Sequence, residues 1–468
     1  MTAADPRHDV LITGGTIVTM DRQRRVIEDG AVLVRDGRIA AVGTRAEVGP
    51  SPTGATTIEA RDGLVLPGFI NTHTHLFQAL FKGLGDDRPL YRWLTEMTTP
   101  AAVALEEEDC EAAGLTGAVE AIRSGTTTIV DFMYTHPRPR LTDAVIRGLA
   151  ASGIRAVVCR GFVTEGGDLG IPEAIVETVD AALADTERLV RKHNTADSLI
   201  RVGVAPTLLW MVDEGALRAT REFADANGTL ITYHLAETSF EVDYARRRYG
   251  VRETEVLAST GILGPDFLGV HCTKVDGEDI RVMKAYDAKV SHNPISNMYL
   301  GSGVAPIVTM LAAGLSIGLG SDGPASNNNQ NMIHVLKFAA LLHKVAHEDA
   351  TAMTAEKVLE MATIDGARAI GMEDEIGSIE LGKRADLSVM AFDNPFVGPV
   401  HDPVSAIVYA ALGNEARWVL VDGRVVMADG KLTKLDEDAV RARAATAARG
   451  LAARAGIGSA RRTWRSPE

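Results

Sequence analysis

The sequence predicts an α/β fold in which a closed (β/α)8 barrel carries a small composite β-sandwich built from both chain termini. Two observations carry this prediction. In the middle of the chain, about eight apolar, β-branched runs alternate with helix-like segments, a pattern typical of a parallel sheet covered on both faces. Near both ends, short strand-like segments are separated by turn signals. A doubly wound open sheet is the alternative, and the positions of the polar residues distinguish the two.

Residues 1–65 are predicted to form the N-terminal part of the sandwich. Asp36-Gly37 is typical of a tight hairpin turn between two strands. The same style returns near the other end of the chain, and we expect residues 385–435 to complete the sandwich. The strand-like segments of both regions are residues 9–20, 30–43, 56–66, 384–392 and 417–432.

Residues 66–384 are predicted to form the barrel. Residues 106–125 and 214–228 are examples of the helical segments between its strands. The Ala- and Arg-rich residues 436–468 are expected to form a C-terminal helix and tail that pack on a neighbour. The predicted barrel strands lie within residues 64–75, 125–133, 154–162, 200–210, 228–237, 267–273, 288–297 and 315–323.

Polar residues stand at the carboxyl ends of the predicted strands. The first run ends in His73 and His75, which point to the same side because strand residues two apart share a face. The fifth, sixth and eighth runs end in His234 with Glu237, in His271 and in Asp322. In a closed barrel these ends converge on one face, where barrel active sites lie, whereas an open sheet spreads them along a line. The pattern therefore favours the barrel.

Four of these residues are suited to one divalent metal ion, Zn²⁺ or Fe²⁺. Imidazole nitrogens and a carboxylate, as supplied by His73, His75, His234 and Asp322, are ligands that such metals accept. A bound divalent metal makes water reactive near neutral pH. Glu237, three residues after His234, is the candidate general acid and base. His271 is the candidate group that orients the attacking water or stabilises developing charge, and Asp322 is also expected to accept a proton.

Two other motifs are set aside. Gly318 to Gly323 matches a dinucleotide-binding pattern, but no acidic residue follows on a second strand, and Asp322 is already part of the metal set. His343 and His347 have the spacing of a zinc-binding helix. Lys344 stands where the catalytic glutamate belongs, so we expect this stretch to be a helix surface.

Composition excludes several functions. The chain has 468 residues, a net charge of −14 and three cysteines that are far apart in the sequence. An acidic protein of this kind is not a general nucleic-acid binder. No segment is long and apolar enough to cross a membrane. The N-terminus does not resemble a signal peptide, and the cysteine usage is typical of a reducing cytoplasm.

The motifs carry a resemblance to a known family. Residues 66–78, 234–238, 291–297 and 318–328 resemble the deaminase and chlorohydrolase branch of the amidohydrolase superfamily. Residues 296–306, 357–372 and 375–387, together with the closing Trp-Arg-Ser, are similar to the s-triazine hydrolases. The resemblance covers essentially the whole chain. It implies the same barrel, the same four metal ligands, catalytic Glu237 and His271, and a substrate pocket that includes Gln78, Trp93, Trp210, Asn297 and Ser326.

The chain departs from this resemblance at three positions. Where chlorohydrolase members have Asn after the metal-binding Asp, this chain has Gly323. Members that deaminate adenosine derivatives hold the ribose with a His and a Glu, and this chain has Thr207 and Ala102 there. A free base or triazine therefore suits the predicted pocket better than a nucleoside.

We accordingly expect a metal-dependent aminohydrolase that releases ammonia from an amino-substituted N-heteroaromatic ring, an s-triazine, a pyrimidine or a purine base. The alternatives are dechlorination of chloro-s-triazines and deamination of nucleosides of the S-adenosylhomocysteine or methylthioadenosine type. A catalytically silent scaffold is disfavoured because every expected metal ligand is present. The expected partner is the small heteroaromatic amine. A homo-oligomer is expected from the arginine-rich tail and from the apolar helix at 331–347.

Overall fold

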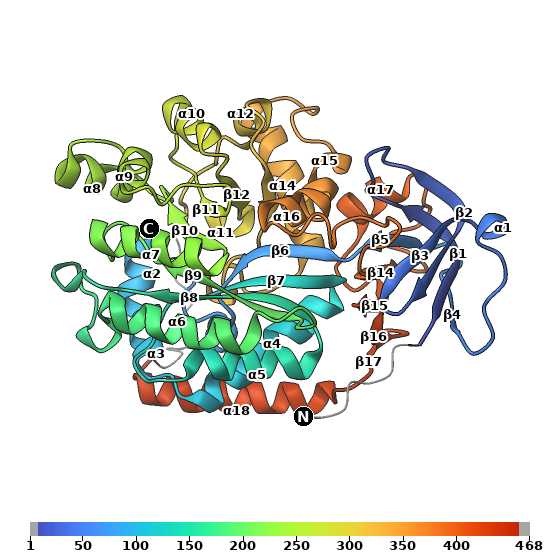
Figure 1. Cartoon of the computed structure of the whole chain (residues 1–468), viewed down its shortest axis with the longest axis horizontal. Helices are drawn as coiled ribbons and strands as arrows, with labels where there is room; N and C mark the ends of the chain where they lie inside the picture. Colours follow the sequence, from blue (N-terminus) through green and yellow to red (C-terminus); the bar gives the residue numbers. More distant parts are fainter. Residues whose placement is uncertain (1–7, 458–468) are drawn as a thin grey trace, which may run out of the picture.

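Eight parallel strands form the central sheet, and each is followed by one or more helices (Figure 1). The computed structural model describes residues 8–457. The strands lie side by side in chain order, and their side chains are almost entirely buried, as expected for parallel strands covered on both faces. They are β6 (Phe69–Thr74), β7 (Thr126–Met133), β8 (Arg155–Phe162), β9 (Ile200–Pro206), β10 (Ile231–Leu235), β11 (Phe267–His271), β12 (Lys289–His292) and β13 (Ile317–Leu319).

Contacts between β6 and the end of β13 bring the first and last strands together. The backbone N–H of Asp322 donates to the carbonyl of His73 at 3.0 Å. The amide oxygen of Asn71 accepts from the backbone of Ser321, also at 3.0 Å. Gly318 permits the close approach, because a Cβ at this position would lie 2.4 Å from the Thr72 side chain. The predicted barrel is thereby confirmed, and the residues that follow β6 and β13 share one end of it.

The first predicted barrel strand is divided in the structure. Residues 64–75 were expected to form one strand, but Leu64–Pro67 (β5) pairs with terminal strands, and only Phe69–Thr74 (β6) belongs to the barrel. Gly68 separates them, and a Cβ there would lie 2.1 Å from the Thr127 side chain. A continuous apolar run does not reveal such a change of sheet, because both halves are buried.

Both chain ends contribute to one nine-stranded sheet beside the barrel (Figure 1). Its N-terminal and C-terminal halves join where β5 pairs antiparallel with β14, which confirms the composite domain. The strands are β1 (Val10–Val18), β2 (Val26–Arg35), β3 (Arg38–Thr44), β4 (Thr56–Glu59), β5, β14 (Leu387–Met390), β15 (Ala416–Val421), β16 (Arg424–Ala428) and β17 (Lys431–Leu432).

Two Asp-Gly turns from opposite chain ends meet in this domain. Asp36-Gly37 connects β2 to β3, and Asp422-Gly423 connects β15 to β16; all four residues have positive φ, as tight hairpin turns require. A Cβ on Gly423 would lie 2.5 Å from the Cα of Gly37. The sheet therefore curls until its two hairpins touch, around a core that includes Ile12, Ile58 and Leu387.

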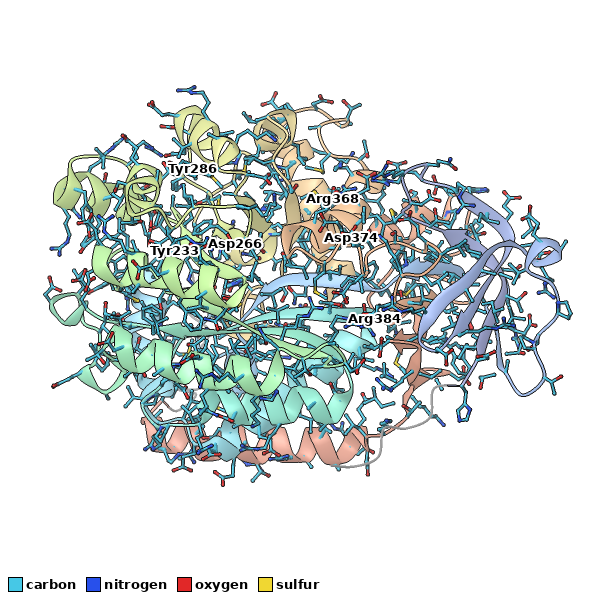
Figure 2. The ribbon with its side chains drawn as sticks, in the orientation of Figure 1. Tyr233, Asp266, Tyr286, Arg368, Asp374 and Arg384 are labelled. Carbon is cyan, nitrogen blue, oxygen red and sulfur yellow. The ribbon has the colours of Figure 1, made fainter. Side chains whose placement is uncertain are left out.

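Buried ion pairs join the terminal domain to the barrel. Arg155 at the start of β8 donates to both oxygens of Asp386, at 2.7 and 2.9 Å. Asp386 also accepts from the backbone of Asp422 at 2.8 Å. Arg384 lies between the barrel strands and the terminal sheet, where it binds Asp422 at 2.7 Å (Figure 2). Each charge in this group has a partner of opposite sign, as burial requires.

The helices begin and end where their terminal residues indicate. Asp213 caps α7 by accepting from the Ala216 backbone, and Gly228 ends the helix with a φ of 60°. The longer helices are α4 (Glu107–Arg123), α5 (Leu141–Ser152), α6 (Val179–His193), α7 (Glu214–Asn227), α8 (Ser239–Tyr249), α9 (Glu253–Thr260), α10 (Gly277–Ala285), α14 (Met332–His347) and α18 (Glu437–Ala455).

Shorter helical segments fill the connections, many of them at the carboxyl end of the barrel. They are α1 (Arg45–Val48), η1 (Leu76–Leu80), α2 (Leu90–Trp93), η2 (Leu94–Thr98), α3 (Thr99–Val103), η3 (Gly167–Leu169), η4 (Glu173–Ile175), α11 (Pro294–Tyr299), α12 (Ile307–Ala312), α13 (Pro324–Asn327), α15 (Ala355–Met361), α16 (Ile364–Ala369), α17 (Pro403–Ser405) and η5 (Ala406–Ala410).

The C-terminal helix packs on the barrel as predicted. Helix α18 lies along α4 (Figure 1), where Arg443 donates to Glu111 at 3.0 Å and Arg454 pairs with Asp109. The rest of the predicted arginine-rich tail, residues 458–468, lies outside the described residues. Among residues 8–457, no helix combines the length and apolar character needed to span a membrane.

Candidate active site

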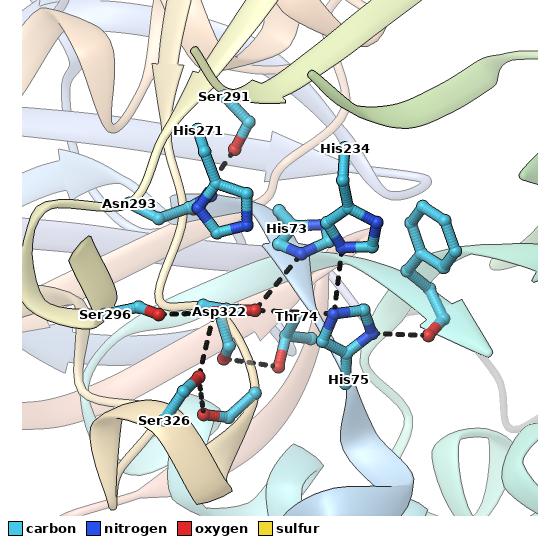
Figure 3. A network of polar contacts seen from close by, with 12 residues as sticks. His73, Thr74, His75, His234, His271, Ser291, Asn293, Ser296, Asp322 and Ser326 are labelled. Atoms are coloured by element: carbon cyan, nitrogen blue, oxygen red, sulfur yellow. Dashed lines mark hydrogen bonds and ion pairs between the residues drawn. The ribbon is translucent and has the colours of Figure 1, made fainter. Parts of the chain in front are cut away.

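Five polar side chains converge at the carboxyl end of the barrel (Figure 3). His73 lies within β6 and His75 directly after it. His234 lies in β10, His271 ends β11, and Asp322 follows β13. All five are buried. The convergence predicted from the strand ends is therefore present, and it places four nitrogen donors around one carboxylate.

The ligand-type atoms lie close enough to share one metal ion. Asp322 Oδ1 lies 3.2 Å from His73 Nε2 and 3.4 Å from His75 Nε2. His234 Nε2 lies 3.2 Å from His75 Nε2 (Figure 3). Ligand atoms of His73, His75 and Asp322 fall within 4.8 Å of one another, and so do those of His73, His234 and His271. These separations are those of donors around a tetrahedral divalent ion.

Unpartnered atoms provide a test of whether the site fits a metal. Both ring nitrogens of His73 and Oδ1 of Asp322 are fully buried, yet they have no hydrogen-bond partner within residues 8–457. Buried polar atoms without partners are costly and rare. Burial lowers the pKa of His73 to about 4 and that of His75 to about 3, so both rings are neutral and offer a lone pair. The donor set fits a divalent metal ion.

Two of the imidazoles are oriented by main-chain carbonyls. Nδ1 of His75 donates to the carbonyl of Phe132 at 2.7 Å, and Nδ1 of His234 donates to the carbonyl of Thr207 at 3.0 Å. Each bond places the proton on Nδ1 and directs Nε2 into the site. Histidines that bind metals are typically held this way.

The two oxygens of Asp322 have different surroundings. Oδ1 faces the histidines, while Oδ2 accepts from the hydroxyls of Ser296 at 2.5 Å and Ser326 at 2.8 Å (Figure 3). Burial acts to raise the pKa of Asp322, but the close approach of His73 and the other neighbouring imidazoles hold it well below its usual range. Asp322 is therefore ionised, with Oδ1 directed at the metal position.

Glu237 lies beside this cluster in a position suited to proton transfer. Its Oε1 accepts from Ser302 at 2.9 Å, and its Oε2 lies 3.6 Å from His271 Nε2. The side chain is buried, and burial raises the pKa of Glu237 to about 7. A carboxyl group with a pKa near neutrality can both accept and donate a proton under physiological conditions.

His271 is held from behind by an amide. Its Nδ1 donates to Oδ1 of Asn297 at 2.9 Å. Asn297 and Ser326 were expected to line the substrate pocket, but neither is among the residues that line the cavity described below. Instead Asn297 contacts His271 and Ser326 contacts Asp322. Ser296 and Ser302 were not predicted as site residues, although both lie in the motif at residues 296–306; Ser296 donates to Asp322 and Ser302 donates to Glu237.

Several residues of the site have strained backbones. Ala236, His271, Cys272 and Asp322 have φ between 44° and 69°, a region that non-glycine residues rarely adopt. They follow β10 or β13, or lie at the end of β11. Such conformations persist where the surrounding structure holds them, and they are common at functional sites. Here they turn the chain at the strand end and direct the candidate site residues inward.

A cavity of about 400 Å³ opens over the cluster, with Gln78, Trp93 and Trp210 in its lining. Trp93 already donates its indole N–H to the carbonyl of Ala325 at 3.1 Å. By contrast, Gln78 Oε1 and Trp210 Nε1 are buried without partners among the described residues. These two side chains of the cavity lining therefore hold one acceptor and one donor that are not used within the described structure.

Gln78 occupies the space beside Gly323. A Cβ on residue 323 would lie 1.9 Å from Gln78 Oε1, so a larger residue there would require the glutamine to move. The asparagine of chlorohydrolase members is therefore incompatible with this arrangement of Gln78. Glycine at position 323, where chlorohydrolase members have asparagine, thus leaves the space that Gln78 occupies.

The two positions expected to hold a ribose offer no group for it. The Thr207 hydroxyl lines the cavity but donates to the carbonyl of Phe162 at 2.6 Å. Ala102 is buried in α3 and does not line the cavity.

The expectation that His343 lies on a helix surface is wrong. His343 is fully buried on α14, and its Nε2 contacts Nε2 of His292 at 3.0 Å. Spacing along one helix does not show which face packs against the barrel.

A buried cluster of three or four imidazoles and a carboxylate at the strand ends of such a barrel defines a class, the metal-dependent barrel hydrolases. Comparison with known proteins identifies the family within this class. The model of the Amidohydrolase family matches residues 64–426, and that of the bacterial imidazolonepropionase-like composite domain matches residues 30–49. The chain is 39% identical over 440 residues to a 5'-deoxyadenosine deaminase of Methanothermobacter thermautotrophicus. The matched region covers 94% of this chain and 98% of the relative.

Solved structures of similar fold include two zinc-containing enzymes. An adenosine deaminase from Xanthomonas campestris with bound zinc has a TM-score of 0.89 at 30% identity, covering 95% of this chain and 99% of that one. A zinc complex of atrazine chlorohydrolase from Arthrobacter aurescens TC1 has a TM-score of 0.89 at 25% identity, covering 94% and 100%. The chain belongs to the amidohydrolase family. It is a hydrolase of carbon–nitrogen bonds from the deaminase and chlorohydrolase branch, with a site for a divalent metal ion.

Proposed function

We propose that this protein hydrolytically deaminates an amino-substituted N-heteroaromatic ring. The observation that carries the proposal is the buried cluster of imidazoles and Asp322 beside one largely apolar cavity. His75, His234, His271, Asp322 and the proton-transfer candidate Glu237 line that cavity. His73, His75, His234 and Asp322 would hold the metal. Glu237 and His271 would act on the substrate.

The reaction replaces an amino group on a ring carbon by the oxygen of water. A bound divalent metal would lower the pKa of water and so supply a nucleophile. Glu237, ionised at the start, takes a proton from the water and passes it to a ring nitrogen. His271 stabilises charge at the attacked carbon. Asp322 accepts the second proton of the water. This proton then passes, by way of the deprotonated Glu237, to the amine, and the carbon–nitrogen bond breaks to release ammonia.

Zinc is the metal we propose. The donor set of imidazoles and one carboxylate suits both Zn²⁺ and Fe²⁺. Zinc is favoured because the adenosine deaminase and the atrazine chlorohydrolase of similar structure contain it. Elemental analysis of protein purified without added metal distinguishes the two, and an active protein with no bound transition metal would contradict the proposal.

The ring is proposed to be of the adenine or triazine type. Gln78 and Trp210 line the cavity, and a rotation of either side chain would present its unpartnered Oε1 to an exocyclic amine or its Nε1 to a ring nitrogen. A second candidate is a nucleoside of the 5'-deoxyadenosine type, which the 39% identical relative favours. The absence of a free polar group at Thr207 and Ala102 favours the base instead.

An ammonia-release screen tests the function. Purified zinc-loaded protein is given aminated triazines, pyrimidines, purines and their nucleosides, and ammonia is measured by an enzyme-coupled assay. A chlorotriazine is included with chloride as the readout, and Gly323 leads us to expect no chloride release. Release of ammonia from at least one aminated ring is expected. Full metal occupancy with no ammonia from any member would contradict the proposal and favour a silent scaffold.

The protein is also proposed to self-associate through α14. Phe338, Leu341 and Val345 are 44%, 43% and 73% exposed and lie three and four residues apart, on one face of the helix. Exposed apolar stripes of this kind mark interaction surfaces. A second copy of this chain is the proposed occupant, because the same stripe on two helices related by a two-fold axis is complementary to itself.

A cytoplasmic location is proposed from the cysteines. Cys110, Cys159 and Cys272 are free and buried, and burial raises the pKa of each thiol. Unpaired thiols are typical of reducing compartments.

A further inference from the structure

Lys274 contributes a positive charge to the wall of the active-site cavity. It follows His271 by three residues, in the segment between β11 and α10, and it is the only lysine or arginine among the described residues that line the cavity. Its backbone is held from both sides: the N–H donates to the carbonyl of Ala236 at 2.9 Å, and its own carbonyl accepts from Arg252 at 2.9 Å. The position of this lysine at the cavity is therefore fixed by the loop.

The Lys274 ammonium has no partner among residues 8–457. Its Nζ forms no ion pair or hydrogen bond with any residue that the structure describes. The acidic groups in the cavity wall are engaged elsewhere: Glu237 with Ser302 at 2.9 Å, Glu241 with the Thr238 backbone at 2.8 Å, and Asp322 with its serines. The lysine thus stands as an uncompensated cation at the site.

The loop opposite Lys274 leaves room for the ammonium. A Cβ on Gly303 would lie 2.6 Å from Lys274 Nζ, and Gly303 has a φ of 129°, which other residues rarely adopt. Glycine at this position therefore keeps the lysine head group free of a contacting side chain. The neighbouring Leu300, Gly301 and Ser302 line the same part of the cavity.

The rest of the wall is mainly apolar, and the cavity exceeds a bare ring. It includes Leu90, Leu94, Leu208, Met211, Phe240 and Leu300. A volume of about 400 Å³ is in the range that accepts drug-sized ligands, so a ring at the metal leaves space for a substituent. A single ammonium is a point charge that matches one carboxylate, whereas phosphate is usually bound by several donors or by arginine.

We propose that the substrate carries a carboxylate on an arm attached to its ring, and that Lys274 binds this carboxylate. The inference rests on the proposed function, which supplies the ring and its place at the metal. It makes Lys274 a specificity determinant that distinguishes acidic from neutral amino-heteroaromatic compounds.

A matched set of adenine derivatives tests the inference. The carboxypropyl, butyl and phosphonopropyl derivatives, all substituted at the same ring nitrogen, are compared for ammonia release and for binding to the zinc-loaded protein by calorimetry. The variants are Lys274→Met, Lys274→Arg and Lys274→Glu. Lys284→Met is the matched control, because Lys284 is exposed on α10, away from the cavity lining, and donates to the carbonyl of Gly314 at 2.6 Å.

The readout is the preference for the carboxylate over the butyl compound. We expect wild type to prefer the carboxylate about tenfold or more, Lys274→Met to lose about that factor through KM rather than kcat, and Lys274→Glu to reverse it. Lys274→Arg and Lys284→Met should keep the preference. An equal preference in wild type and Lys274→Met would overturn the inference, as would a Lys274-dependent preference for the phosphonate.

The two measurements separate this inference from the proposed function. If ammonia is released and substitution of Lys274 does not change the preference for the carboxylate, the inference is contradicted and the proposed deaminase function is supported. Carboxylate binding that depends on Lys274, in a protein that releases no ammonia from any ring, supports the carboxylate site and contradicts the deaminase.

Discussion

Glu237 and His73 lie in the same cluster but have different proposed roles, and substitution separates them. Glu237→Gln is expected to keep the metal, because glutamine is nearly isosteric and Glu237 bonds to Ser302 rather than to the ligand set. Turnover should fall by about 10²–10⁴-fold, the usual contribution of a positioned acid and base. Metal content by elemental analysis and kcat on the substrate found by screening provide the measurement.

His73→Ala is the companion variant. It removes one nitrogen of the proposed ligand set, so metal occupancy should fall together with the rate. Loss of metal in Glu237→Gln, or near-normal deamination by it, would show that Glu237 is not the proton carrier.

The raised pKa of Glu237 predicts an acidic limb in the pH profile. Glu237 must be ionised to take a proton from water, and burial raises its pKa to about 7. The charge of a bound metal acts in the opposite direction, so kcat/KM should fall by about tenfold per pH unit below a midpoint at or under about pH 7. Initial rates from pH 5 to 9 test this, with Glu237→Gln as the control that should lack the limb.

At the scale of elements, Glu253 connects α9 to β10 and supports the turn that carries Glu237. Tyr233 in β10 donates to Glu253 Oε1 at 2.7 Å, and the backbone of Ala236 donates to Oε2 at 2.9 Å. Ala236 has a φ of 44° and directly precedes Glu237. The first residue of one helix thereby holds the strained end of a neighbouring strand.

The burial of Glu253 predicts a pH-dependent stability. Burial raises its pKa from the ordinary value of 4.5 to about 8, so its stabilising contribution is complete below about pH 4.5 and is lost as the pH rises through 8. Glu253→Gln mimics the neutral acid. Relative to wild type, the free energy of unfolding of Glu253→Gln should therefore rise by roughly 1.4 kcal/mol per pH unit between pH 5 and 8. Its melting temperature relative to wild type should rise over the same interval.

Thermal unfolding of both proteins at four pH values across this interval provides the measurement. A difference in melting temperature that is constant with pH would show that Glu253 is ionised in the folded protein throughout.

At the scale of the whole molecule, the Arg155–Asp386 pair joins the barrel to the terminal sheet. Both side chains are nearly inaccessible to solvent, at 4% and 1%. Arg155→Ala leaves a buried carboxylate without its partner and should lower the free energy of unfolding by about 3–5 kcal/mol. Arg92→Ala, which removes an exposed pair with Glu96, is the control and should cost under about 1 kcal/mol. Equal effects in denaturant unfolding would contradict this assignment.

The apolar stripe on α14 predicts a change of assembly. Val345→Lys places a charge in the most exposed position of the stripe and should shift the protein toward a monomer in size-exclusion chromatography with light scattering. Val26→Lys, at a 55% exposed valine on β2, should not. A wild-type monomer at micromolar concentration would contradict self-association through this face.

Much of the fold was predictable because it depends on local patterns. Alternation of apolar runs with helical segments reports burial on both faces of a sheet, and Asp36-Gly37 and Asp422-Gly423 require positive φ wherever they occur. The division at Gly68 was not predictable, because a strand that leaves one buried sheet for another has the same apolar composition throughout.

The location of the site followed from the sequence alone, since parallel strands of a barrel end on one face and His73, His234 and Asp322 stand at those ends. The contacts that the side chains around the site make could not be predicted from the sequence. Asn297 faces His271, His343 is buried against His292, and Lys274 lacks an acidic partner in the described part of the chain. Each of these depends on contacts between segments far apart in the chain, and only the tertiary structure decides them, because residue type and spacing do not specify which loops meet.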